Sequence, residues 1–232
     1  MPLHFGTSEF TARISRAQAA LEEAGLDAIL LFAPESHLWL SGYDTFGFAM
    51  FQCMVLGADG RIDLLTRAPD LRQARHTSIL GEDQIHIWME VEGATPAQDL
   101  ARLLASRGMT GKRIGWETQT PGLTTWNGDM VRAAIPNLIE ASDVIRACRR
   151  VKSPAEIAMH RRAAALSDDA LDAALETTRA GASRAIFSQR CKARSLRAAA
   201  IMRGTSLFSG PAPALCCVDI IQDDGRWMRR TN

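Results

Sequence analysis

The stretch Arg149-Arg150-Val151-Lys152-Ser153-Pro154-Ala155-Glu156 divides this 232-residue chain into two parts with different patterns. Ser153 suits the N-cap of a helix, Pro154 suits its first position, and Glu156 completes a capping box. Too few residues follow for a second full-sized domain. We therefore expect the helix to begin a new unit that the chain does not finish.

The residues before this stretch alternate between strand and helix patterns. An amphipathic helix is predicted over residues 8–24 with a stop at Gly25, and the apolar run 28–32 predicts a strand buried on both faces. Further strands are predicted at residues 48–56 and 62–66, as a hairpin around residues 58–60, and at 85–88, 113–117 and 138–140. Further helices are predicted at 34–42, at 95–108, with a capping box at Thr95 and a stop at Gly108, and at 123–134. This order predicts an α/β domain over residues 1–145, with a mixed or parallel sheet flanked by helices. We expect the mixed form.

The second part begins as a helix and then changes in composition. Residues 146–187 are predicted to form a linker and a first packed helix, in which Ile157, Ala164 and Leu171 recur every seven residues before a stop at Gly181. Residues 188–232 form an atypical basic tail, and the surrounding stretch 177–218 contains no Asp or Glu. An out-of-frame or truncated catalytic domain explains this tail best. An anion- or RNA-binding extension and a disordered tail are the alternatives.

Composition excludes several classes of protein. The formal net charge is +1, the start of the chain lacks the basic and apolar regions of a signal peptide, and no apolar stretch approaches the ~20 residues that span a bilayer. We therefore expect a cytoplasmic protein with no nucleic-acid and no membrane partner. Five cysteines follow no metal-ligand spacing, which favours reduced thiols: Cys53, Cys148, Cys191, Cys216 and Cys217.

Two motifs carry a resemblance to a known family. The segment Leu38-Trp39-Leu40-Ser41-Gly42-Tyr43-Asp44 and the junction Arg150–Ile157 resemble the creatinase/prolidase family, in wording closest to its ectoine-hydrolase-like and Xaa-Pro-dipeptidase-like branches. The likeness extends from about Phe10 to about Phe187. It implies a creatinase-type N-terminal α/β domain followed by an incomplete α+β segment of a "pita-bread" catalytic domain. His37 stands near a position where relatives often carry Asn.

The resemblance also implies an activity that this chain is not equipped to perform. Members of the family are metal-dependent hydrolases that cleave C–N bonds in Xaa-Pro peptides or in small amide or cyclic compounds. They use two divalent metals, such as manganese, cobalt or zinc, held by two Asp, one His and two Glu. Asp219 is followed eleven residues later by Arg230, Asp223 and Asp224 have no later carboxylate or histidine, and the last histidine is His160. We therefore predict no catalytic residue, metal ligand or cofactor in this chain, and no activity by the chain alone.

Four aromatic residues near a glycine turn are the candidate functional residues: Trp39, Tyr43, Phe46 and Phe48. They form either a structural cluster that supports the turn or, by the resemblance, a cap over the active site of a partner subunit. The resemblance thus implies a homodimer formed through the N-terminal domain. The rival hypothesis is a non-catalytic dimerisation or substrate-capping module. His76 and His86 have no ligand-spaced acid or cysteine nearby and are predicted to be structural.

Overall fold

The computed structural model describes residues 3–45, 47, 49–89, 91–93 and 95–178. The chain divides into a unit that runs to Val151 and a second unit from Lys152 onward. Within the described residues of the first unit, the strands are β1 (Ala28–Leu31), β2 (Cys53–Gly57), β3 (Ile62–Arg67), β4 (Ile85–Trp88), β5 (Ile114–Trp116) and β6 (Ile139–Glu140). Its helices are α1 (Thr7–Glu23), α2 (Pro34–Ser41), α3 (Leu71–Thr77), α4 (Pro96–Ser106), α5 (Thr125–Ala134) and α6 (Ser142–Arg150). Short 3-10 turns, η1 (Ala68–Asp70) and η2 (Glu82–Gln84), follow β3 and precede β4.

The strands form one mixed sheet in the order β4-β3-β2-β1-β5-β6. The pairs β1–β2 and β2–β3 are antiparallel, whereas β3–β4, β1–β5 and β5–β6 are parallel. The predicted mixed sheet and the predicted hairpin are therefore confirmed. Gly60 turns the hairpin with a φ of 84°, a left-handed conformation that glycine adopts without steric cost. The first hairpin strand begins at Cys53 rather than at the predicted residue 48.

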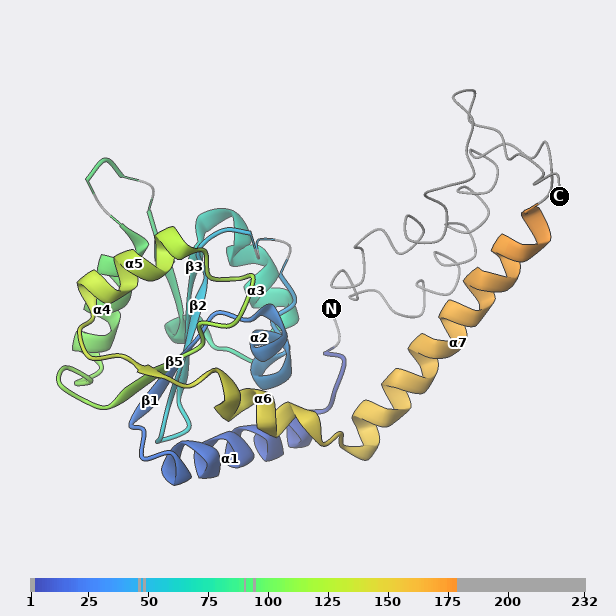
Figure 1. The fold of residues 1–232 in the computed structure, drawn as a ribbon, viewed down its shortest axis with the longest axis horizontal. Coiled ribbons are helices and arrows are strands. Elements are labelled where there is room, and N and C mark those ends of the chain that lie inside the picture. Colours follow the sequence, from blue (N-terminus) through green and yellow to red (C-terminus); the bar gives the residue numbers. More distant parts are fainter. Residues whose placement is uncertain (1–2, 46, 48, 90, 94, 179–232) are drawn as a thin grey trace, which may run out of the picture. The chain divides into compact units, whose positions relative to one another are not determined.

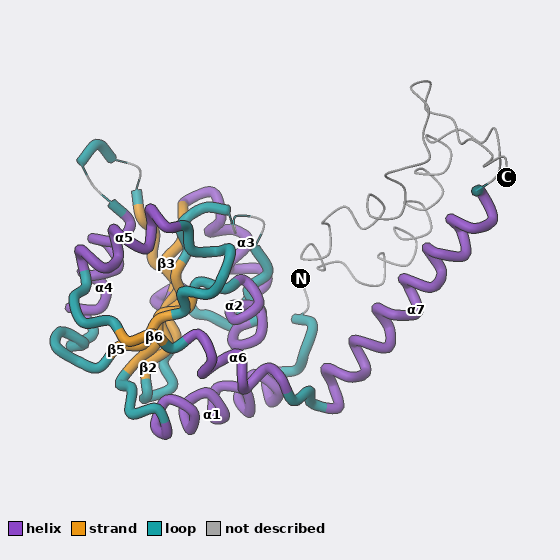
Figure 2. The backbone as a smooth tube through the Cα atoms, viewed as in Figure 1, coloured by secondary structure: helices purple, strands orange, loops and turns teal. Residues whose placement is uncertain are grey.

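The sheet is covered by helices on both faces, as Figure 1 shows. Side chains alternate across β1: Ile29 and Leu31 contribute to one core cluster, and Ala28 and Leu30 contribute to the other. Because both faces of β1 are buried, its sequence is apolar at every position. The first cluster lies under α1, α2, α3 and α6, and the second lies under α4 and α5. The sheet itself separates the two layers, as the tube view makes clear (Figure 2).

Two helices of the first unit were not expected from the sequence. Helix α3 connects β3 to β4, and α6 follows β6 and packs against α1. Arg16 on α1 donates a hydrogen bond to the backbone carbonyl of Cys148 at 2.8 Å. Residues 146–150, assigned to a linker in the sequence analysis, thus complete α6. The compact unit extends beyond residue 145 to Val151.

The capping box that opens the second unit is present. Ser153 Oγ accepts a hydrogen bond from the Glu156 backbone N–H at 3.1 Å, and Glu156 Oε2 accepts one from the Ser153 backbone N–H at 2.8 Å. Helix α7 (Pro154–Thr177) follows. The helix differs from the packed helix that was predicted, because Ile157, Leu171 and Leu175 are exposed. Gly181 and the basic tail 188–232 lie outside the described residues.

Candidate functional site

A turn that begins at Gly42 follows α2, the helix that comes after β1. Gly42 ends the helix in a left-handed conformation, with a φ of 80°, and its N–H donates to the Leu38 carbonyl at 2.9 Å. A Cβ atom at this position would lie 2.8 Å from the backbone oxygen of Thr77. Glycine is therefore required here both by the backbone angle and by the close approach of Thr77, the last residue of α3.

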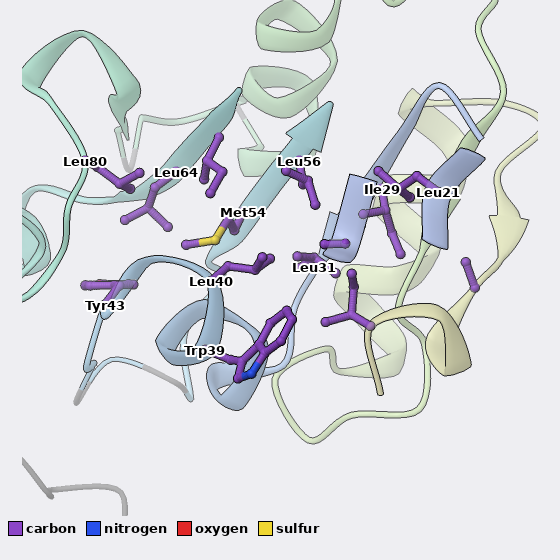
Figure 3. Close-up of a cluster of buried hydrophobic side chains, with 14 of the residues drawn as sticks. Leu21, Ile29, Leu31, Trp39, Leu40, Tyr43, Met54, Leu56, Leu64 and Leu80 are labelled. Atoms are coloured by element: carbon purple, nitrogen blue, oxygen red, sulfur yellow. The ribbon is translucent and has the colours of Figure 1, made fainter. Parts of the chain in front are cut away.

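Trp39 and Tyr43, two of the four candidate residues, are buried. Both belong to the first core cluster, where Figure 3 shows them beside Leu40 and Met54. The Arg13 Nη1 of α1 donates to the Trp39 carbonyl at 3.0 Å, and its guanidinium lies 5.8 Å from the indole ring. Helix α1 thus fixes the position of Trp39. Phe46 and Phe48 lie outside the described residues, so the capping role stays a prediction.

The hydroxyl of Tyr43 reaches a small polar group inside the fold. It lies 3.4 Å from Thr66 Oγ1 on β3, and burial raises the pKa of the phenol, so that it stays protonated at neutral pH. Nearby, Asp70 accepts hydrogen bonds from Gln52 Nε2 at 3.2 Å and from Arg67 Nε at 3.0 Å. These contacts connect the turn to β3 and the residues after it.

His37 is a buried histidine of α2 that stacks on Tyr43, with ring centroids 6.1 Å apart. Its Nε2 lies 2.8 Å from the carbonyl oxygen of Leu31, which can only accept, so Nε2 carries the proton. Its Nδ1 has no hydrogen-bond partner in the part of the chain that the structure describes. Desolvation lowers the pKa of His37 to about 4. The imidazole is therefore neutral at pH 7 and supports the packing of α2 on β1.

Glu117, directly after β5, was missed in the sequence analysis. Its Oε2 accepts from the backbone N–H groups of Phe32 and Ala33 at 3.1 and 3.0 Å, and its Oε1 accepts from Ser36 Oγ at 2.7 Å. Burial raises the pKa of this carboxyl. One acid thus joins the ends of two parallel strands to the first turn of α2. The signal in the sequence that could have identified Glu117 is an acidic residue at the end of a predicted apolar strand.

The two histidines predicted to be structural differ in their surroundings. His76 lies on α3 and is exposed. His86 lies on β4, with Nε2 3.0 Å from Oδ1 of the buried Asp63, whose Oδ2 accepts from Arg107 Nε at 2.9 Å. This ion group ties β3 and β4 to the end of α4.

Metal-binding chemistry is not assembled by the described residues. Among them, no three His, Cys, Asp or Glu side chains lie close enough together to hold a metal ion. Their donor set therefore does not fit a two-metal centre. The acids considered earlier, Asp219, Asp223 and Asp224, lie outside the described residues. Cys53 and Cys148 are free thiols. The described helices include none long and apolar enough to cross a membrane.

The fold defines the class first: an α/β domain with a mixed six-stranded sheet and helices on both faces. It resembles the structure of a Xaa-Pro dipeptidase from Bacillus anthracis with a TM-score of 0.62 and 21% identity, over 81% of this chain and 49% of that one. It resembles the dipeptidase PepE from Mycobacterium ulcerans with a TM-score of 0.63 and 22% identity, over 84% of this chain and 51% of that one. These likenesses establish the fold.

Sequence comparison then establishes the family. Residues 13–151 match the model of the Creatinase/Prolidase N-terminal domain, and the chain belongs to this family. It is 25% identical over 162 residues to the ectoine hydrolase of Halomonas elongata, across 67% of this chain and 41% of that protein. It is 24% identical over 215 residues to the uncharacterized hydrolase/peptidase y4tM of Sinorhizobium fredii, across 90% of this chain and 53% of that protein. The chain thus spans about half or less of the length of these relatives.

Proposed function

We propose that this chain forms the N-terminal part of a metal-dependent hydrolase that cleaves C–N bonds, in Xaa-Pro peptides or in small amide or cyclic compounds. The observation that carries the proposal is the family match over residues 13–151, together with the similarity to a hydrolase of ectoine. The chain is inactive by itself on this proposal, since its described residues offer no group of metal ligands. Two divalent metals, of the manganese, cobalt or zinc type, belong to the catalytic part of such a hydrolase.

The same proposal gives the domain a role in assembly. It forms a homodimer through residues of the N-terminal domain, and the turn after α2 extends over the catalytic part of the partner subunit. Trp39 and Tyr43 are buried, which supports a role as anchors that hold this turn in shape. Direct contact with a substrate would then fall to exposed residues further along the chain, such as Ala49 and Met50.

A non-catalytic dimerisation or substrate-capping module is the second candidate. It is favoured by the absence of a three-ligand group among the described residues, combined with a well-packed N-terminal unit. The two candidates differ in what the DNA encodes after the codon for Phe187. A coding sequence in any frame for two Asp, one His and two Glu at the family's spacing supports the hydrolase. Its absence refutes the hydrolase and leaves the module.

Two assays on the purified 232-residue chain complete the test. After incubation with manganese, cobalt or zinc, we expect less than stoichiometric metal by mass spectrometry and no turnover of ectoine or of a Xaa-Pro dipeptide. Stoichiometric metal with turnover would overturn the proposed inactivity. Light scattering across a wide concentration range is expected to show a dimer, and a strict monomer would contradict the proposed assembly.

A further inference from the structure

A cavity lies where the connections of the sheet diverge. After β1 the chain passes through α2 to β2 on one side, and after β5 it passes through α5 to β6 on the other. In open α/β sheets, such a switch point at the carboxyl ends of parallel strands is a common place for ligands. Here a cavity of about 260 Å³ is lined by residues that directly follow the paired strands β1 and β5.

Six side chains from three separate segments give this cavity its chemistry: Glu35, Glu117, Thr120, Ser142, Arg146 and Arg149. Arg146 and Arg149 lie three residues apart on α6, so both guanidinium groups are on one face of the helix. Arg149 Nη1 donates to Ser36 Oγ at 3.1 Å, and its charge opposes that of Glu117.

Neighbouring residues orient the side chain of Arg146 but use only some of its N–H donors. Its Nη1 donates to Gln119 Oε1 at 3.2 Å and to Asp143 Oδ1 at 3.0 Å, and its Nη2 donates to the Gln119 carbonyl at 3.4 Å. A guanidinium carries five N–H donors, so N–H groups remain for a further acceptor. The side chain is 44% exposed, which lets a ligand reach it from solvent.

Two hydroxyl groups add donors. Thr120 Oγ1 accepts from the Gly122 N–H at 3.1 Å, and Ser142 Oγ accepts from the N–H groups of Thr118 and Gln119 at 2.9 and 3.0 Å. Within the described residues, neither hydroxyl donates its own proton to an acceptor. Since backbone N–H groups fix both oxygens, each proton is available to a bound acceptor.

The two carboxylates set a limit on the charge of the ligand. Both oxygens of Glu117 already accept hydrogen bonds from Phe32, Ala33 and Ser36, so this acid adds negative charge but little further accepting capacity. Glu35 adds a second negative charge at the exposed side of the cavity. The two guanidinium groups are opposed by Glu35, by Glu117 and by the Asp143 that pairs with Arg146, so a ligand with one negative charge is tolerated better than a ligand with two.

We propose that this cavity binds a small monocarboxylate, whose oxygens accept hydrogen bonds from Arg146 and from the hydroxyls of Thr120 and Ser142. Planar carboxylates match the fork of N–H groups on a guanidinium. The site rests on residues of the first unit and does not depend on the hydrolase activity proposed above.

Acetate is the probe, titrated into the full 232-residue chain at constant ionic strength and followed by amide chemical shifts. Saturable one-to-one binding is expected, with a dissociation constant on the order of 1 mM, a value typical of a few polar contacts. Neutral acetamide is expected to bind at least about tenfold more weakly, and inorganic phosphate more weakly than acetate. Acetamide equal to acetate, phosphate tighter than acetate, or no saturation would overturn the proposal.

Two matched variants locate the binding. Arg146→Gln is expected to raise the dissociation constant by at least about tenfold, because it removes a charge-assisted hydrogen bond to the ligand. Arg102→Gln is the control, because Arg102 on α4 is also paired with an aspartate three residues earlier but lies outside the cavity. It should bind acetate as the parent chain does. Thr120→Val, which removes one hydroxyl, is expected to weaken binding about fivefold. Unchanged binding by Arg146→Gln would refute the assignment.

Discussion

Acidification is expected to destabilise this domain through His37. The imidazole is buried and its folded-state pKa is about 4, against 6.5 for an exposed histidine. Between these values the unfolded chain binds a proton that the folded chain does not, so stability falls as the pH falls through this window. At 1.36 kcal/mol for each pKa unit, the full effect is about 3 kcal/mol and is reached below pH 4.

The assay is urea unfolding followed by tryptophan fluorescence at several pH values between about 7.5 and 4. Glu117 works in the opposite direction, since a raised carboxyl pKa gives stability that is lost as the pH rises. The test therefore compares the parent chain with His37→Gln, in which an amide can still donate to the Leu31 carbonyl. The pH-dependent difference between the two should approach about 3 kcal/mol near pH 4.

The control is His76→Gln, at an exposed histidine of α3, which should reproduce the pH profile of the parent chain. Parallel profiles for the parent chain and His37→Gln would refute the reasoning. So would a midpoint for His37 near 6.5 in a proton titration followed by NMR.

Three further substitutions test other parts of the structure. Gly42→Ala is expected to lower the unfolding free energy by about 2 kcal/mol or more, since a Cβ would meet the backbone of Thr77. Gly108 is also left-handed but has open space around it, so Gly108→Ala should lower the unfolding free energy by only about 1 kcal/mol. Equal losses at the two glycines would contradict this account. Ser153→Ala should cost helix α7 about 1 kcal/mol, visible as reduced helical circular dichroism, and unchanged helicity would argue against the cap. Asp63→Asn should destabilise the domain by about 2 kcal/mol in urea, because it weakens a buried acceptor of Arg107 and His86; full retained stability would count against that ion group.

Patterns of local origin predicted the fold well. The continuous apolar run of β1, the glycine stops after α1 and α4 and the two capping boxes at Thr95 and Ser153 are each confirmed. Each depends only on neighbours in sequence, which is why periodicity and capping chemistry reveal it. The mixed sheet was also foreseen, because hairpin signals and helical crossovers occur together.

Contacts between residues that are distant in sequence could not be predicted from periodicity or capping patterns. Glu117 finds its donors on Phe32 and Ala33 only after β1 and β5 have paired. The cavity at the switch point likewise needs three segments that the sheet brings together. Helix α6 was taken for a linker because its arginine-rich end hides the short apolar face that packs on α1.

The position of β1 has a consequence for the order in which the domain folds. On one side β1 pairs with β2, which follows soon after it in the chain. On the other side β1 pairs with β5, where the partner of Ala28 is Ile114, far along the sequence. During synthesis the β1–β4 part of the sheet can form while the second edge of its most apolar strand still lacks a partner. An unpaired apolar edge is a site of misassociation between nascent chains. Chaperone dependence should therefore be greatest while residues 32–113 emerge from the ribosome, and should decline once β5 pairs with β1.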